Sequence, residues 1–372
     1  MKYGKVILVV LALALIAVWG CERKVVNEYT NTTDAAGCVN SCHNDSDGAL
    51  QQAEGEWQNS IHASGNNIDY TNRGGGSDCT KCHDHQGFLD FLATGTVSAP
   101  YSKVSAIGCF TCHAPHSTFT LELRTVAPYT MPAGNVFDHG NGNLCVNCHH
   151  VRDKASTIVA ATDSFTIDTR WGPHHGAQGE MVSGTGGYLF AGYTYDSDPH
   201  ASVVREACAG CHMGNVQTHD GYDVGGHSFN MRALEDSTIT MVKYCSSDSI
   251  GCHVTKWTNF DMLEDSVDYD GDGELEGCQS ETHGMLDSLE ALLISRGLLT
   301  LQQGSYLPAK QKKVLKDEAG AVYNFLLIEE DRSFGVHNFA YMAGLLQSSI
   351  EYIESTMPTS SRPDENQLYS SH

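Results

Sequence analysis

One five-residue pattern, Cys-x-x-Cys-His, constrains the fold of this chain more than any other feature of the sequence. It occurs at residues 79–83, 109–113, 145–149 and 208–212. This pattern is the attachment signature of c-type haem: two thiols bond to the vinyl groups of one porphyrin, and the adjoining histidine binds its iron. A single copy would also fit half of a zinc site, but the repetition favours haem. We therefore expect several haems to replace much of the usual side-chain core.

Two further motifs have longer spacers, and the first of them is Cys38-Val39-Asn40-Ser41-Cys42-His43. Its terminal Cys-His pair is intact, which predicts another haem site. A local disulfide between Cys38 and Cys42 is the competing interpretation.

The last motif ends in Cys252-His253, and six residues separate Cys252 from Cys245. The intervening segment can form a loop while both sulfurs keep their places, so we predict a haem here as well. The alternative is a haem held by Cys252 alone, with Cys245 paired to Cys278.

The cysteine count supports the full set of six motifs. Of fourteen cysteines, twelve are predicted attachment residues: Cys38, Cys42, Cys79, Cys82, Cys109, Cys112, Cys145, Cys148, Cys208, Cys211, Cys245 and Cys252. The adjoining proximal iron ligands are His43, His83, His113, His149, His212 and His253. Of the remaining two, Cys21 belongs to the predicted lipid anchor, which leaves Cys278. Because an exposed thiol outside the cytoplasm is reactive, Cys278 is predicted to be buried, bonded to another chain, or evidence against the sixth motif.

The N-terminus has the parts of an export signal. Lys2 and Lys5 precede an apolar run over residues 6–18, which is short for a bilayer span. Residues 18–21, Val-Trp-Gly-Cys, resemble a bacterial lipobox, after which Cys21 becomes the lipidated first residue. We expect residues 1–20 to be a lipoprotein signal peptide, and the protein to be exported as an outer-membrane lipoprotein on the periplasmic or cell-surface face. A plain signal peptide or an uncleaved anchor is the alternative.

The chain is strongly acidic, with a formal net charge of −23. Such a surface repels nucleic acid and anionic lipid, and it suits docking to cations or basic partners. The simpler interpretation is that the acidity only keeps the protein soluble.

The six motifs resemble those of multihaem c-type cytochromes, in particular the outer-surface and periplasmic respiratory cytochromes of metal-reducing bacteria. The resemblance covers roughly residues 38–355. It implies a mainly α fold with extensive irregular loops and little β structure, organised by the haems and closed by a C-terminal helical segment. It also implies six covalently bound haems c, with a second histidine as the distal ligand of each iron.

Histidine is abundant enough for that ligation, because nineteen are present and six are proximal. Segments similar to distal-ligand segments of multihaem families surround His62 (W-x-x-S-x-H-A), His227 (G-G-H-S-F) and His337 (G-x-H-N). The other candidates occupy positions that recur as ligands or stand next to such a position: His116, His139, His174, His175 and His200. Only one of the two adjacent histidines is expected to bind iron. A methionine ligand at one iron is the alternative.

Residues 268–276 resemble the front half of a calcium-binding loop, with aspartates at positions 1, 3 and 5 and Gly273 at position 6. Position 12 is Gln279 instead of glutamate, so Glu276 or Glu281 would supply the missing carboxylate. A solvated acidic turn is the alternative. The candidate calcium ligands are Asp268, Asp270, Asp272, Glu274 and Glu276.

The last third of the chain changes character, because apolar residues recur there at helical spacing. We predict helices over residues 281–299, 308–330 and 335–356 that form a helical hairpin against the haem region. The expected organisation is a polar tether (21–37), a haem-binding region (38–255), a segment with the calcium-like loop and the helices (256–357), and a flexible tail (358–372).

An iron with both axial positions filled by protein has no place for a substrate, so the predicted role is to pass electrons. We expect an electron conduit in periplasmic or extracellular respiration, directed toward metal oxides or another cytochrome, and not an enzyme. The expected partners are other redox proteins, such as cytochromes and quinol-linked or porin-cytochrome complexes, or extracellular acceptors. Two alternatives are a reductase of a small nitrogen or sulfur oxyanion with one open haem, and a subunit of a polymeric cytochrome filament.

Overall fold

The computed structural model describes residues 48–64, 77–97, 101, 104–118, 120–214, 217–219, 222–233, 237–245, 252–253, 257–262 and 267–358. The chain divides into two units, Met1–Gln52 and Ala53–His372. Only residues 48–52 of the first unit are described, where helix α3 (Ala49–Gln58) begins. Everything that follows concerns the second unit.

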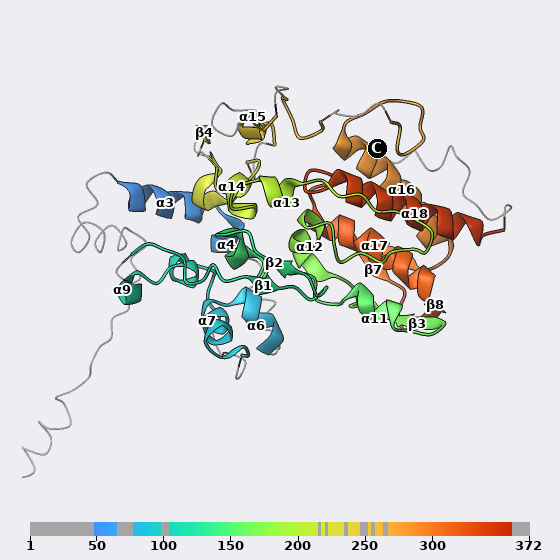
Figure 1. Cartoon of the computed structure of the whole chain (residues 1–372), viewed down its shortest axis with the longest axis horizontal. Coiled ribbons are helices and arrows are strands. Elements are labelled where there is room, and N and C mark those ends of the chain that lie inside the picture. Colours follow the sequence, from blue (N-terminus) through green and yellow to red (C-terminus); the bar gives the residue numbers. More distant parts are fainter. Residues whose placement is uncertain are drawn as a thin grey trace, which may run out of the picture. The chain divides into compact units, whose positions relative to one another are not determined.

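Short helices and loops make up most of the described chain before residue 278, as expected for a mainly α fold with irregular loops (Figure 1). Few of these helices exceed two turns, because few apolar residues recur there at the helical spacing that would give a helix a face to bury. The helices are α4 (Ile61–Ser64), α6 (Ser77–His83), α7 (His85–Thr94), α8 (Cys109–Cys112), α9 (Pro115–Thr118), α10 (Gly142–Cys145), α11 (Ala155–Val159), α12 (Gln178–Val182), α13 (His200–Val203), α14 (Cys208–His212) and α15 (Val242–Cys245), with 3₁₀ turns η2 (His174–Gly176) and η3 (Gly226–Ser228).

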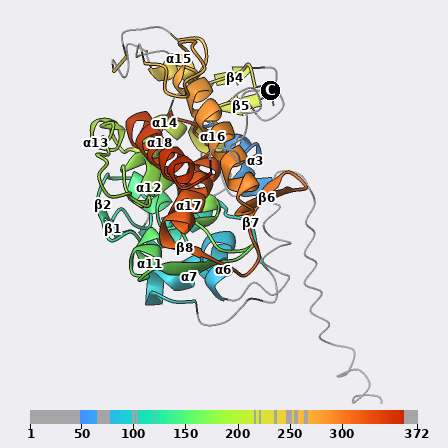
Figure 2. The same ribbon diagram turned by 90° about the vertical axis from the view of Figure 1, so that its right-hand side faces the viewer.

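Three long helices follow, and they confirm the predicted C-terminal helical segment: α16 (Cys278–Ser295), α17 (Lys316–Asp331) and α18 (Phe339–Ser355). They pack on one another and lie side by side in both views (Figures 1 and 2). The start of α18 is fixed by Asn338, whose side-chain oxygen accepts a hydrogen bond from the Tyr341 N–H at 3.3 Å. This is the usual way in which an asparagine satisfies a free N–H in the first turn of a helix.

The predicted start of the second helix at Pro308 is wrong, because two strands occupy residues 305–315 instead. Strand β7 (Ser305–Pro308) pairs with β6 (Leu299–Gln302), and β8 (Lys312–Leu315) pairs with β3 (Ser164–Ile167). In β8, Val314 is buried and Leu315 is exposed, which is the alternation of a strand and not a helical stripe. Both pairings are antiparallel, as are β1 (Tyr129–Thr130) with β2 (Val136–Phe137) and β4 (Gln217–His219) with β5 (Tyr222–Val224).

The largest hydrophobic core lies among the three long helices and extends to residues 151–190. Helix α17 contributes most of its length to this core and packs against η2, α11 and α12. Two hydrogen bonds hold α17 against this segment. The Tyr323 hydroxyl donates to the Asp153 carbonyl at 2.7 Å, and the Gln178 amide donates to the Glu330 carbonyl at 3.1 Å. The long helices are therefore joined directly to the segment that carries the 145–149 motif.

Two smaller apolar clusters lie beside other motifs. One contains Met131, Phe137, Val146 and Ala207, and the other is centred on Met241 and Val242. Within the described residues, no helix is long and apolar enough to cross a membrane.

Candidate haem sites

Each regular motif lies on a short helical turn, namely on α6, α8, α10 with the residues that follow it, or α14. The histidine N–H donates to the carbonyl of the first cysteine, at 3.0 Å for His113 to Cys109 and 2.9 Å for His149 to Cys145. Residues four apart on a helical turn share a face, so the first thiol and the imidazole point to the same side. This is the local geometry that attachment to one porphyrin needs.

The long motif closes with the same backbone hydrogen bond. The His253 N–H donates to the Cys245 carbonyl at 3.3 Å, although seven residues separate the two. Burial raises the pKa of the Cys211 thiol, and the nearby Cys245 and Cys252 thiols raise it further. The ends of the long motif are therefore arranged as in a regular one, while residues 246–251 lie outside the described part of the chain.

Cys278 begins α16 and is half-buried, with its thiol 3.5 Å from the Phe260 carbonyl. The first motif, with Cys38, Cys42 and His43, lies outside the described residues, and so does Cys21.

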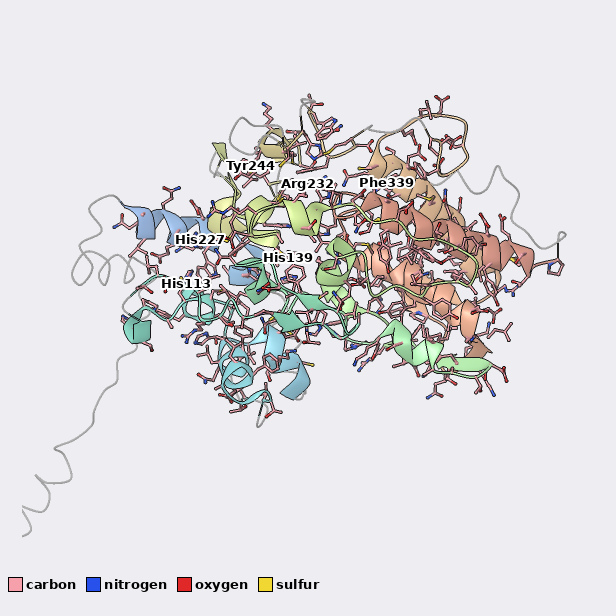
Figure 3. The ribbon with its side chains drawn as sticks, viewed as in Figure 1. His113, His139, His227, Arg232, Tyr244 and Phe339 are labelled. Carbon is pink, nitrogen blue, oxygen red and sulfur yellow. The ribbon has the colours of Figure 1, made fainter. Side chains whose placement is uncertain are left out.

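The five described proximal histidines each face a second histidine from a distant part of the chain, and every second histidine is one of the predicted distal ligands. Figure 3 shows one of the pairs, His113 with His227. The ring centroids are 6.2 Å apart for His83–His174, 6.3 Å for His113–His227, 6.2 Å for His149–His62, 6.3 Å for His212–His337 and 6.1 Å for His253–His200.

These separations match two imidazoles that bind one metal ion from opposite sides. With metal–nitrogen bonds of about 2 Å and each ring nitrogen about 1 Å from its ring centre, the two centroids lie about 6 Å apart. Ordinary aromatic pairs span roughly 4.5–7 Å, so one such pair would mean little. Five pairs within 0.2 Å of one another, each joining a motif histidine to a predicted partner, fit axial ligation of haem iron.

Two of the predicted distal histidines lie where the backbone bends sharply. His174 has a positive φ of 65° and follows Gly172 and Pro173. His227 follows two glycines with positive φ, Gly225 and Gly226, a conformation that favours glycine. His62 lies on α4 with its ring against Phe229, at 5.0 Å between centroids.

Three predicted distal candidates do not belong to the five pairs. His175 contacts Glu330 through Nδ1, so of the two adjacent histidines it is His174 that faces a motif histidine. His116 is exposed and lies beside Phe110, and His139 is half-buried beside Phe137.

Burial keeps several of the paired imidazoles neutral. Loss of solvent lowers the pKa of His62, His174 and His212 to about 4 and also lowers the pKa of His83 and His149. A neutral imidazole is the form that binds a metal ion. His337 differs, because the charge of Asp331 and a hydrogen bond to it outweigh burial and raise its pKa.

The attachment motifs adjoin one another in space. The Cys82 and Cys148 thiols lie close enough to shift each other's pKa, and so do the Cys145 and Cys208 thiols. The Cys145 thiol also contributes, after burial, to raising the pKa of Cys112. The 145–149 motif thus adjoins three other motifs, those at 79–83, 109–113 and 208–212. The 208–212 motif in turn adjoins the one that ends at His253.

The predicted calcium loop is folded around its first aspartate. Asp268 accepts hydrogen bonds from the Gly271 N–H at 2.6 Å and the Gly273 N–H at 2.9 Å, and Gly273 has the positive φ of 93° that favours glycine. Carboxylate oxygens gather within 4.8 Å of one another in two sets: Asp268, Asp270 and Glu281, and Asp270, Asp272 and Glu276. Neither set contains Glu274. Burial, together with the charges of Asp272 and Glu281, raises the pKa of Asp270 to about 6.

Three residues that hold the paired imidazoles carry no signal in the sequence. Gln178 lies 3.1 Å from Nδ1 of His149, Glu56 lies 3.5 Å from Nδ1 of His227, and Asp331 lies 2.7 Å from Nδ1 of His337. Their distances from the motifs along the sequence vary widely, so no pattern of spacing marks them.

The motifs and the paired imidazoles together define the class: the chain is a multihaem c-type cytochrome with covalently bound haem c. No protein-family model matches it. Among curated proteins it is similar to two C-type polyheme cytochromes of Geobacter sulfurreducens, OmcB and OmcC. Each is 22% identical over 312 residues, a match that covers 74% of this chain.

The chain spans little more than a third of these relatives, 37% of OmcB and 36% of OmcC. Among solved structures, the crystal structure of the outer cell wall cytochrome OcwA is 20% identical, with a TM-score of 0.48. That match covers 80% of this chain and 49% of the other.

Proposed function

We propose that this protein conducts electrons through six covalently bound haems, each held by two axial histidines where the structure describes both. The five imidazole pairs carry this proposal. The pairs support the following distal ligands for His83, His113, His149, His212 and His253, respectively: His174, His227, His62, His337 and His200. When bound, haem iron supplies one-electron redox chemistry.

The chain's own part in this function is to fill both axial positions and to keep the sites adjacent. Two imidazoles on one iron leave no position for a substrate, which favours an electron carrier over an enzyme. The adjoining thiols link the 79–83, 145–149 and 208–212 motifs and the motif that ends at His253 into one series. The 109–113 motif adjoins this series at Cys145. A continuous series of sites is what electron passage through the protein requires.

Electron paramagnetic resonance of the fully oxidised protein tests the ligation. Low-spin ferric signals alone are expected. A high-spin ferric signal equal to one haem per chain would contradict the conduit and favour the reductase, in which one iron is open. The motif at Cys38–His43 would then be the first suspect, since its residues lie outside the described part of the chain; His116, His139 and His175 are the predicted ligands left for it.

Mass spectrometry of the mature protein tests the haem count. Six haems are expected, because the His253–Cys245 hydrogen bond closes the long motif as in the regular ones. A mass that corresponds to five haems would favour the disulfide alternative for one of the two irregular motifs.

We further propose that the protein is exported and anchored through Cys21, and that its partners are other redox proteins or extracellular acceptors. The N-terminal signal and the net charge of −23 support this. If the anchor is right, Cys21→Ser moves the protein from the membrane fraction to the soluble fraction. Negative-stain microscopy distinguishes single particles from the filament alternative.

We also propose a Ca²⁺ ion at residues 268–281. The folded loop and the gathering of Asp268, Asp270 and Glu281 support it, with Glu281 as the carboxylate that position 12 lacks. Isothermal titration with Ca²⁺ should show one site for each chain. Absence of binding would favour the alternative interpretation, a solvated acidic turn.

A further inference from the structure

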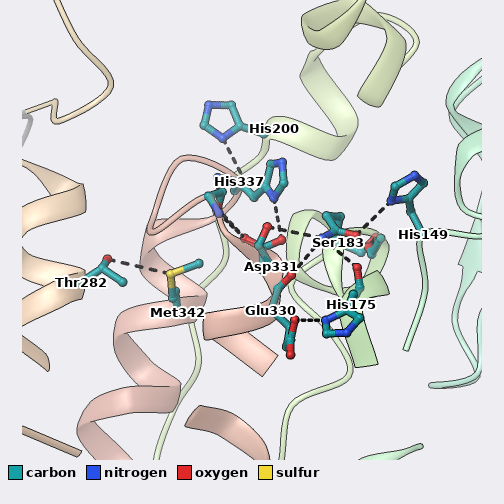
Figure 4. A network of polar contacts seen from close by, with 12 residues as sticks. His149, His175, Ser183, His200, Thr282, Glu330, Asp331, His337 and Met342 are labelled. Carbon is teal, nitrogen blue, oxygen red and sulfur yellow. Dashed lines mark hydrogen bonds and ion pairs between the residues drawn. The ribbon is translucent and has the colours of Figure 1, made fainter. Parts of the chain in front are cut away.

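The structure singles out one of the paired histidines by what holds its ring. Nδ1 of His337 lies 2.7 Å from Oδ1 of Asp331, and the Asp331 side chain is fully buried. Figure 4 shows the two side chains in contact, where the loop after α17 turns toward α18. Asp331 is the last residue of α17, and His337 lies two residues before α18.

The contact is fixed from both sides of the loop. The Ser333 N–H donates to Oδ2 of Asp331 at 3.3 Å, and the His337 N–H donates to the Ser333 hydroxyl at 3.2 Å. Next to His337, the Asn338 side chain accepts the Asp198 N–H at 2.8 Å and donates to the Ser197 hydroxyl at 2.9 Å. The imidazole and the carboxylate are therefore held in one orientation.

Other paired histidines make weaker contacts at the same ring atom. Nδ1 of His212, His200 and His113 meets a backbone carbonyl, at 2.9, 3.3 and 3.4 Å. Nδ1 of His149 meets the neutral amide of Gln178 at 3.1 Å. Glu56 is another carboxylate near such an atom, and it lies 3.5 Å from Nδ1 of His227. The same Glu56 oxygen accepts a shorter hydrogen bond, 2.8 Å, from the backbone N–H of His227.

The chemistry of this contact follows from which ring nitrogen binds iron. An axial histidine binds through Nε2, so Nδ1 carries the proton and its N–H donates a hydrogen bond to the carboxylate. A carboxylate that accepts this hydrogen bond makes the imidazole a stronger electron donor. A stronger donor, together with a negative charge in a buried setting, favours ferric over ferrous iron and lowers the reduction potential.

We propose that Asp331 sets the potential of the haem held by the 208–212 motif and His337, and makes it the lowest among the five described sites. The proposal rests on the proposed function, because it requires His337 to be an axial ligand. Asp331 is a positioning and tuning residue that acts through His337. The series of adjoining motifs places this haem between the 145–149 motif and the motif that ends at His253. The low potential thus falls inside the series and not at its end.

Asp331→Asn is the direct test, since asparagine keeps an oxygen that can accept from Nδ1 but carries no charge. Changes at such partner residues typically alter metal affinity by 10- to 100-fold. We expect about a tenfold change in the ferric-over-ferrous preference, which is about 59 mV for a one-electron couple. Potentiometric titration followed by visible absorption should show the lowest midpoint rising by that amount. One low-spin resonance signal should change its g values.

Glu330→Gln is the matched control. It removes the same charge one residue away, from a carboxylate that contacts His175, which belongs to none of the five pairs. A smaller shift than in Asp331→Asn supports the specific contact. Equal shifts in the two variants, or no shift in Asp331→Asn, overturn the proposal.

His337→Ala separates this proposal from the function on which it rests, and it also serves if Asp331→Asn does not fold. A new high-spin ferric signal in this variant shows that His337 is a ligand, and the lowest wild-type midpoint should then disappear. If the high-spin signal forms while the lowest midpoint stays, the tuning proposal fails and the ligation stands. If all irons remain low-spin, the assignment of His337 as a ligand fails, and the tuning proposal fails with it.

Discussion

Glu180 should make the stability of the helical region depend on pH, and the effect can be worked out from its surroundings. The side chain is fully buried on α12 between the 145–149 segment and the long helices. One oxygen accepts the Val151 N–H at 3.0 Å, and the other has no hydrogen-bond partner among the described residues. Burial raises the pKa of Glu180 from 4.5 to about 7.

The sign of the effect follows from where the proton is lost. Between pH 4.5 and about 7 the unfolded chain releases the proton of Glu180, whereas the folded protein keeps it. The free energy of unfolding therefore falls as pH rises through this window, and the loss is complete above pH 7. At about 1.4 kcal/mol for each pH unit, a rise from 4.5 to about 7 amounts to about 3 kcal/mol.

Glu180→Gln removes this dependence while keeping the shape of the side chain. We expect the variant to be similar to the wild type in stability at pH 4.5, and more stable by up to about 3 kcal/mol at pH 8. Urea unfolding followed by circular dichroism at the helix band measures both. Asp196→Asn, which changes an exposed carboxylate, is the control and should follow the wild type at every pH. A wild-type–variant difference that stays constant from pH 4.5 to pH 8 would refute the reasoning.

Three further predictions address the sites. His200→Ala should create one high-spin ferric haem, because the ring that faces His253 at 6.1 Å is lost. The same change at His85, whose Nδ1 meets the Thr111 hydroxyl, should not; resonance spectra of the two variants decide this. Cys245→Ser should leave one haem attached through a single thioether bond at Cys252, so the haem count by mass spectrometry should not change. The unreacted vinyl group should shift the absorption band of that haem in the pyridine haemochrome spectrum. Ca²⁺ should raise the unfolding temperature and Asp270→Asn should abolish that rise. The stabilisation should also weaken as pH falls through about 6, because protonated Asp270 cannot bind the cation.

The haem-attachment sites could be predicted from the sequence because covalent attachment is a local matter. Two thiols and an imidazole must reach one porphyrin from one turn, so spacing alone marks the sites. The calcium-like loop and the three long helices could be predicted as well, because their patterns also depend on residues that are close together in the sequence. The helix predicted from Pro308 failed because Val314 fits a helical stripe and a strand equally well over so few residues. Val314 pairs with Phe165 of β3, 149 residues earlier in the sequence, and this pairing decided for the strand.

The distal ligands could be predicted only in part from the sequence. Sequence context selected eight candidate histidines but could not assign them to motifs, since the partner of each comes from a distant segment. The structure brings five of them to five motif histidines, and it places His174 instead of His175 opposite His83.

The sequence by itself determined the class of this protein and predicted its attachment residues and proximal ligands, because those depend on neighbours within a few residues. Only the tertiary structure decided which histidine faces which motif, how the motifs adjoin, and that a buried Asp331 holds His337. The physical reason is that the facing histidines lie 53 to 125 residues apart in the sequence, and their distances, like the burial of Asp331, are set by the packing of the whole unit.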